Sequence, residues 1–215
     1  MKSTRIRHGV RAALPLAVAP FLFGAAFGVL PLDAGLGVSG AITMSATTFA
    51  GSAQFAAATI LDDGGGAAAA IVAALLLNAR YVPLSLAVAS IFPGSRRRRA
   101  LESQLIVDES WALSGRSGRF EYGVLIGAGL LLYVLWIVGT ALGTVAGDLL
   151  DPEAIGLDAA FPALFLALLA PYLRERRALV TAVTAAVITL VLLPVAPPGV
   201  PIVAASLAAL IGLRR

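Results

Sequence analysis

The sequence contains no cysteine and a single histidine, His8, which excludes disulfide bonds, thiolate nucleophiles and clusters of histidine metal ligands. Charge is also scarce, because only 13% of the 215 residues are Asp, Glu, Lys or Arg, against roughly 25% in soluble domains. Neither the HExxH pattern nor the phosphate-binding pattern GxxxxGK[ST] occurs. We therefore expect no enzyme, no metal site, no cofactor and no nucleotide-driven pump.

Hydrophobic residues make up 59% of the chain, and the mean hydropathy is +0.92. Long apolar runs with few charges are typical of membrane-spanning helices. Such segments lie at about 12–32, 40–61, 67–92, 122–147, 158–173, 178–194 and 199–213. They predict an all-α polytopic membrane helix bundle in which residues 1–215 form a single transmembrane domain.

The charged residues between these segments fall into two groups. The basic loops hold Lys2, Arg5, Arg7, Arg11, Arg96, Arg97, Arg98, Arg99, Arg116, Arg119, Arg174, Arg176, Arg177, Arg214 and Arg215; the acidic loops hold Asp33, Asp62, Asp63, Asp148, Asp151, Glu153 and Asp158. The positive-inside rule places the basic loops, and with them both termini, in the cytoplasm. It also explains the net charge of +4 without a nucleic-acid partner.

Segment 40–61 lies between two acidic loops, at Asp33 and at Asp62, so the charge rule does not let it cross the membrane. It is rich in polar side chains and has Gly51 near its middle, which favours a re-entrant segment of two half-helices that meet near Gly51. The prediction is then about six spans plus this re-entrant broken segment. The alternative is an ordinary span rich in small residues, which would place the run 96–99 outside.

Arg80 stands at the midpoint of the apolar segment 67–92, where an arginine costs about 2.5–3.5 kcal/mol on insertion scales. It needs a partner, a water-filled cavity or an anionic ligand. Asn78 and Tyr81 are its polar neighbours, and Pro83 can free a backbone carbonyl. Two interpretations stay open: Arg80 binds a substrate or ion with these neighbours, or carbonyls of the broken segment hold it in a purely structural role.

A second polar group lies in segment 40–61 itself. If the helix breaks at Gly51, the free amides and positive dipole end of a half-helix beside Ser52 suit a carboxylate. Ser45 and Gln54 would join Gly51 and Ser52 in binding a substrate. Ordinary hydrogen bonds between helices explain the same residues equally well.

Three acids are candidates for proton-linked groups. Asp108 and Glu109 are adjacent carboxylates near a basic run, so both acid–base work and salt bridges within a cytoplasmic loop fit the sequence. Asp158 opens the short segment 158–173, where it either caps the first helical turn or serves as a proton-linked carboxylate at the mouth of a cavity.

Glycines recur at small-xxx-small spacing along segment 122–147. They are Gly123, Gly127, Gly139, Gly143 and Gly147. This spacing lets another backbone approach closely, but it does not identify the neighbour.

Four blocks of sequence, in this order, resemble the AzlC family, the large subunits of branched-chain amino acid exporters. They are MSATTFAGSAQFAA (44–57), LLLNARYVPLSLA (75–87), DESWAL (108–113) and GLDAAFPALFLALL (156–169). One departure is visible: the family often has Leu-Arg-His where this chain has Ala79, Arg80 and Tyr81. A proton role for a histidine at that position therefore cannot be transferred.

The resemblance implies a secondary transporter that exports leucine, isoleucine or valine across the cytoplasmic membrane. It also implies a small AzlD-type membrane subunit as partner, for which the glycine-spaced face of 122–147 is the expected contact. With no nucleotide-binding pattern, an ion or proton gradient is the expected energy source. The alternatives are a transporter or channel for another small solute, and a scaffold subunit that transports nothing.

Overall fold

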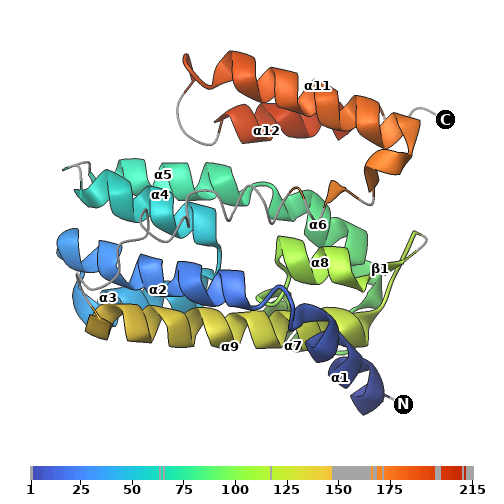
Figure 1. The fold of residues 1–215 in the computed structure, drawn as a ribbon, viewed down its shortest axis with the longest axis horizontal. Helices are drawn as coiled ribbons and strands as arrows, with labels where there is room; N and C mark the ends of the chain where they lie inside the picture. Colours follow the sequence, from blue (N-terminus) through green and yellow to red (C-terminus); the bar gives the residue numbers. More distant parts are fainter. Residues whose placement is uncertain are drawn as a thin grey trace.

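The computed structural model describes residues 2–62, 64, 66–116, 118–146, 166, 169, 170, 172–196, 200–209 and 211. Over these residues the protein is a bundle of α-helices with one short β-hairpin, which agrees with the predicted all-α class (Figure 1). Most of the predicted segment 158–173, and Asp158 with it, lies outside the described residues.

The helices are α1 (Lys2–Ala13), α2 (Val18–Asp33), α3 (Gly37–Thr48), α4 (Gly51–Asp62), α5 (Ala67–Asn78), α6 (Tyr81–Val88), α7 (Arg96–Ser103), α8 (Asp108–Ser114), α9 (Tyr122–Ala146), α11 (Arg176–Leu192) and α12 (Val200–Ser206). Short 3-10 helices are η1 (Ala89–Ile91), η3 (Tyr172–Arg174) and η4 (Leu207–Ala209). The antiparallel strands β1 (Gly115–Arg116) and β2 (Arg119–Phe120) connect α8 to α9.

Helix α9 is the longest described element. Its 25 residues extend about 37 Å, which exceeds the ~30 Å hydrocarbon core of a bilayer. Two further pairs, α1 with α2 and α5 with α6, each contain an apolar stretch long enough to span when the two helices are taken together, but they bend by 68° and 42°. Among the described residues, one to three spans therefore qualify by length and composition; the prediction of six spans and the sidedness of the termini remain predictions.

The glycines of α9 bring α1 and α2 into backbone contact with it. A Cβ on Gly127 would overlap the carbonyl oxygen of Ile6 in α1, and a Cβ on Gly143 would overlap that of Ala25 in α2. The predicted close approach is confirmed. The predicted neighbour is wrong, because the chain's own helices occupy the face that we expected for a small subunit. Small-residue spacing signals close approach without specifying which helix approaches.

The predicted break in segment 40–61 is present. Helix α3 ends at Thr48 and α4 begins at Gly51, and Phe49 between them adopts a left-handed backbone conformation with φ of 41°. Each half has 12 residues and extends about 18 Å, too short to span alone. The outer ends of both halves lie where α2 ends and α5 begins, at the left in Figure 1. The chain thus enters and returns at one end of the bundle.

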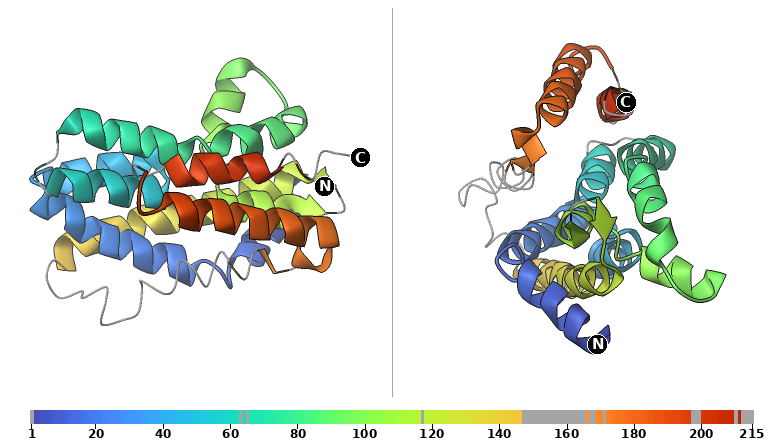
Figure 2. Two further views of the ribbon diagram at one scale, coloured as in Figure 1. Left: turned by 90° about the horizontal axis from the view of Figure 1, so that it is seen from above. Right: turned by 90° about the vertical axis from the view of Figure 1, so that its right-hand side faces the viewer.

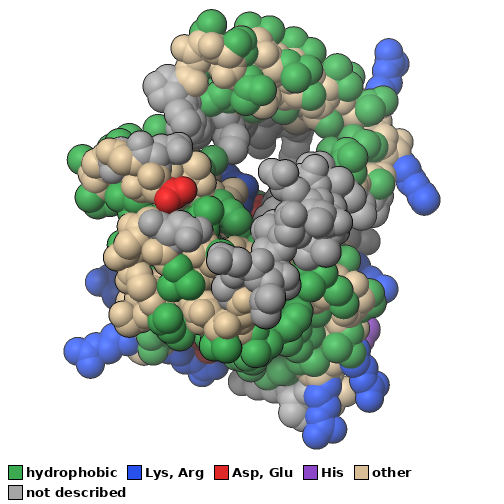
Figure 3. Space-filling model, turned by 60° about the vertical axis from the view of Figure 1, so that its left-hand side comes forward, with side chains coloured by type: hydrophobic (Ala, Val, Ile, Leu, Met, Phe, Trp, Pro, Cys, Tyr) green, Lys and Arg blue, Asp and Glu red, His purple; other side chains and the backbone are tan. Residues whose placement is uncertain are grey.

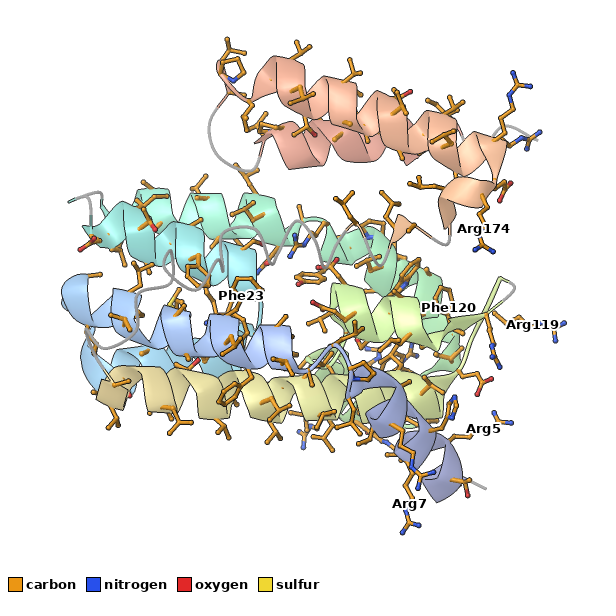
Figure 4. All side chains as sticks on the ribbon, in the orientation of Figure 1. Arg5, Arg7, Phe23, Arg119, Phe120 and Arg174 are labelled. Carbon is orange, nitrogen blue, oxygen red and sulfur yellow. The ribbon has the colours of Figure 1, made fainter. Side chains whose placement is uncertain are left out.

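Basic side chains gather at the opposite end. Arg5, Arg7, Arg119 and Arg174 all lie at the right-hand end or lower right of Figure 4. Helices α11 and α12 pack against each other outside α5, and the end of α12 points to the same side (Figure 2). Such segregation agrees with the charge pattern on which the predicted topology rests.

Large apolar side chains are exposed along the sides of the bundle, as the lipid-facing surface of a membrane protein requires. Leu75 in α5 is 66% exposed and Leu190 in α11 is 69% exposed. Figure 3 shows hydrophobic side chains over much of one described face, while most of the lysines and arginines project at its edges.

The charge segregation predicts which ends can be labelled from each side of the membrane. Because the chain has no cysteine, single cysteines are diagnostic. We expect Ser95→Cys to react with an impermeant maleimide only from the cytoplasmic side, and Asp62→Cys only from outside. Labelling of Asp62→Cys from the cytoplasmic side would contradict the re-entrant arrangement of α3 and α4.

The contact at Gly143 predicts a steric effect on stability. Gly143→Val places a side chain against the Ala25 carbonyl, and overpacking of this kind costs about 1–3 kcal/mol. We expect a lower thermal unfolding temperature in detergent. Gly66→Val is the matched control, because nothing lies within 4 Å of a Cβ at that position. Equal stability of the two variants would show that the α2–α9 contact is looser than described.

Candidate functional site

Two broken helix pairs meet at their breaks. The α3–α4 break lies at residues 49–50, and the α5–α6 break lies at residues 79–80. Ala50 in the break and Ala53 in the first turn of α4 pack against Leu77 near the end of α5, and Tyr81 packs against this cluster. At membrane depth, the free N–H and C=O groups of an interrupted helix need hydrogen bonds from protein or from a water-filled cavity. The residues around the two breaks therefore determine how these groups are satisfied.

A buried hydrogen-bond network holds the α3–α4 break together. The hydroxyl of Ser45 accepts hydrogen bonds from Gln54 Nε2 and Trp136 Nε1, each at 3.1 Å. It donates to Thr140 Oγ1 at 2.8 Å, since the Thr140 hydroxyl itself donates to the Trp136 carbonyl. Gln54 Oε1 accepts from the backbone N–H of Ala50 at 3.0 Å. Each hydroxyl in this network uses its proton, and Ser45 fills both acceptor positions.

Side chains from elsewhere satisfy the carboxyl end of α3. Tyr133 Oη donates to the Ala46 carbonyl at 2.7 Å, and Gln104 Nε2 donates to the Thr47 carbonyl at 2.8 Å. The ring of Phe49 meets the Tyr133 ring edge-to-face, with centroids 5.0 Å apart. The last carbonyls of a helix have no intrahelical donors, so these contacts replace the bonds that a continuous helix would have made.

Arg80 pairs with an acid on another helix. Its Nη2 lies 3.2 Å from Oδ2 of Asp108, the first residue of α8, and 3.3 Å from the hydroxyl of Tyr81. The guanidinium also lies over the Tyr81 ring, 5.1 Å from its centroid. The side chains of Arg80 and Asp108 are 20% and 21% exposed. The charge that costs most in lipid is thus neutralised by a carboxylate but remains accessible.

The sequence did not identify the partner in this ion pair. The structural interpretation of Arg80 required carbonyls of the broken segment, whereas its described ionic partner is Asp108. One of the two interpretations of Asp108 paired it with the neighbouring basic run, whereas the ion pair described for that run joins Arg98 to Glu102, with 2.7 Å between Nε and Oε1. The sequence showed that Arg80 needed a partner, but Asp108 is 28 positions away and reaches it only through the fold.

Glu109 lies beside this pair in α8, outside the spanning helices. Its side chain is buried, and burial together with repulsion by Asp108 raises the pKa of Glu109 to about 7. Burial also raises the pKa of Asp108, while the charge of Arg80 acts in the opposite direction. A carboxyl group with a pKa near 7 gains or loses its proton within the physiological range, as a proton-linked group must.

Two side-chain oxygens at the breaks are buried without a hydrogen-bond partner among the described residues. They are Oγ of Ser52, in the first turn of α4, and Oδ1 of Asn78, at the end of α5. Leaving such a group unsatisfied costs about 1–3 kcal/mol. Buried orphan oxygens of this kind are the atoms that a ligand or an ordered water satisfies.

The structure therefore divides the predicted site residues. Arg80 contacts Tyr81 and Asp108, and Asn78 stands two positions before Arg80 in the chain, whereas Ser45 and Gln54 belong to the buried network. Gly51 is the first residue of α4.

Sequence reasoning missed the side chains that complete the breaks, namely Gln104, Tyr133, Trp136 and Thr140. The available signal was the i, i+4 pair of Trp136 and Thr140 inside an otherwise apolar span, because polar atoms at that depth need buried partners.

Comparisons with known proteins agree with a membrane transport protein. The family model described as "AzlC protein" matches residues 15–150, more than half of the chain. An "Uncharacterized membrane protein" of Archaeoglobus fulgidus is 32% identical over 185 residues, covering 81% of this chain and 79% of the relative. The "Branched-chain amino acid transport protein AzlC" of Bacillus subtilis is 26% identical over 189 residues, covering 82% and 73%. No solved structure matches the chain.

The network around Ser45 predicts a stability effect at Thr140. Thr140→Val preserves the shape of the side chain but removes the acceptor for Ser45. We expect a loss of about 1–3 kcal/mol and an unfolding temperature several degrees lower in detergent. The matched control is Thr184→Val, which removes only an exposed hydrogen bond to the Val180 carbonyl. If both variants unfold at the same temperature, the network does not stabilise the break.

Proposed function

This chain belongs to the AzlC family, and from that premise we propose that it exports branched-chain amino acids together with a small AzlD-type subunit. The chain is a multi-pass membrane protein of the cytoplasmic membrane. The Bacillus subtilis relative carries branched-chain amino acid transport in its name. The family is one of transport-related membrane proteins rather than enzymes, in line with the absence of catalytic patterns from the sequence.

The observation that carries the proposal is the position of Arg80. It lies at the break of the α5–α6 pair, and the next residue, Tyr81, packs against the cluster at the α3–α4 break. Leucine, isoleucine and valine are zwitterions with an aliphatic side chain, so their binding site needs an anion receptor, polar acceptors and an apolar wall. The planar guanidinium of Arg80 is suited to gripping a carboxylate with two parallel hydrogen bonds.

The remaining requirements are met by residues around the two breaks. The orphan oxygens of Ser52 and Asn78 offer hydrogen bonds to a polar headgroup. Ala50, Ala53 and Leu77 form a buried apolar cluster beside these oxygens' helix ends, and we propose that the aliphatic side chain of the substrate packs near it.

The other predicted site residues hold Arg80 and the amino end of α4 in position. Ser45 and Gln54 hold the break through their buried network, which keeps the amino end of α4 at Gly51 in place. Tyr81 stacks on the guanidinium and accepts a hydrogen bond from it. The N-terminal amides of α4 provide a second favourable location for a carboxylate.

Coupling to a gradient is assigned to the acids of α8. Glu109 is the candidate proton-linked group, because its pKa of about 7 lets it change charge near neutral pH. Asp108 connects it electrostatically to Arg80. The small subunit has to contact a surface other than the glycine-lined face of α9, which α1 and α2 already cover.

The proposal predicts the effect of changing Arg80 on leucine transport in vesicles that contain the small subunit. Arg80→Lys retains the charge but loses the planar fork, so we expect leucine affinity to fall about tenfold or more, as the loss of a charged hydrogen bond would cause. Arg80→Leu should abolish leucine transport. Arg119→Lys and Arg119→Leu are the controls, because Arg119 is exposed in the β-hairpin, away from the helix breaks.

Folding has to be measured in parallel, because Arg80→Leu leaves Asp108 without its cation. The double variant Arg80→Leu/Asp108→Leu removes both charges and should restore folded yield without restoring transport. A folded Arg80→Leu protein that transports leucine normally would exclude the carboxylate role. Transport of basic or acidic amino acids in preference to leucine would instead identify a different small solute as substrate.

A further inference from the structure

We propose that Asp108 receives the ammonium group of the substrate, so that the Arg80–Asp108 pair forms a two-charge receptor for a free α-amino acid. The inference rests on the proposed transport of branched-chain amino acids. It adds a specificity-determining residue, because Arg80 alone would recognise any small carboxylate.

The geometry presents two opposite charges to one ligand. Arg80 comes from the break of α5–α6 and Asp108 from the first turn of α8, with 3.2 Å between Nη2 and Oδ2. In an α-amino acid the ammonium and carboxylate are attached to the same carbon, so its two charges are separated by a comparably short distance. Both side chains are about one-fifth exposed, so the ion pair is not sealed inside the core.

Charge balance favours a zwitterion at this location. The Arg80–Asp108 pair has no net charge, and a zwitterion adds none. Each charge therefore has an opposite charge beside it both without and with bound substrate. Removing one partner of a largely desolvated pair leaves an uncompensated charge, which is strongly destabilising. A carboxylate lacking an ammonium group would take Arg80 from Asp108 and leave Asp108 in that state.

Asp108 is better placed than the other polar groups near Arg80. Glu109 is the next carboxyl group in α8, but it is buried, and burial raises its pKa, which disfavours the charged form that an ammonium group needs. The oxygens of Asn78 and Tyr81 carry no charge and add only hydrogen bonds. Among these groups, the ion pair to Arg80 is made by Asp108.

The test compares ligands that lack one charge. Three unlabelled ligands compete with labelled leucine for binding to the full chain with its small subunit. They are leucine, 4-methylpentanoate, which lacks the ammonium group, and 3-methylbutylamine, which lacks the carboxylate. For the wild type we expect leucine to compete at least tenfold better than 4-methylpentanoate. Asp108→Asn should lower the affinity for leucine at least tenfold. The affinity for 4-methylpentanoate should stay unchanged or rise, so the preference for leucine disappears.

Two further variants serve as controls. Asp108→Glu retains the carboxylate and should retain the preference for leucine. Glu102→Gln removes the acid from the Arg98–Glu102 ion pair and should leave the competition by all three ligands unchanged. A general effect of removing any acid from an ion pair would appear in Glu102→Gln as well.

The outcomes separate this inference from the function on which it rests. If Asp108→Asn keeps the full preference for leucine, the ammonium role is wrong, and Arg80 can still bind the carboxylate. If the wild type shows no leucine binding, the proposed function itself is wrong.

A second pair of variants decides the matter if Asp108→Asn folds poorly. In Arg80→Gln, Asp108 is a lone carboxylate that should still bind 3-methylbutylamine, whereas Arg80→Gln/Asp108→Asn should bind it at least tenfold more weakly. Equal competition by the amine in these two variants would overturn the inference.

Discussion

The constraint on which this structure depends is that a polar group inside an apolar bundle needs a hydrogen-bond partner, because lipid supplies none. The chain interrupts its helices at residues 49–50 and 79–80, so carbonyls and amides that a continuous helix would pair internally need partners from elsewhere. Gln104 and Tyr133 supply donors to the carboxyl end of α3, and Gln54 supplies an acceptor to the Ala50 amide. The arrangement of the surrounding helices follows from where these partners stand.

Helix α9 makes this arrangement possible. Its glycines allow α1 and α2 to pack at backbone distance, as the contacts at Gly127 and Gly143 show, and the long helix then runs past the break between α3 and α4. From that position it presents Trp136 and Thr140 to Ser45. A bulkier residue on the glycine-lined face would separate the helices and also displace the side chains that make hydrogen bonds at the break. The hydrogen bonds at the break therefore depend on the close packing of α1 and α2 against α9.

The sequence predicted where the helix breaks and which charge needs a partner, but it did not predict which residues are the partners. The break near Gly51 was predictable, because acidic loops on both sides and many polar side chains do not suit a full span, and the cost of Arg80 in lipid showed that it required a counter-charge or a ligand. The partner Asp108 was not predictable, because α7 and the start of α8 bring it back across 28 positions. Likewise, glycine spacing could not reveal that α1 and α2, rather than a second subunit, cover α9.

The two polar groups at the breaks are built differently, and the difference separates support from function. Around Ser45 every hydroxyl proton is used and the side chains of Ser45, Gln54 and Thr140 are buried, so this network is suited to holding the geometry of the break. Around Arg80 the ion pair is partly exposed, and the orphan oxygens of Ser52 and Asn78 lie at the same breaks. The hydrogen bonds around Ser45 keep the backbone interruption in place, while the partly exposed pair of Arg80 and Asp108 can exchange partners with a substrate. A transporter requires both properties at one site.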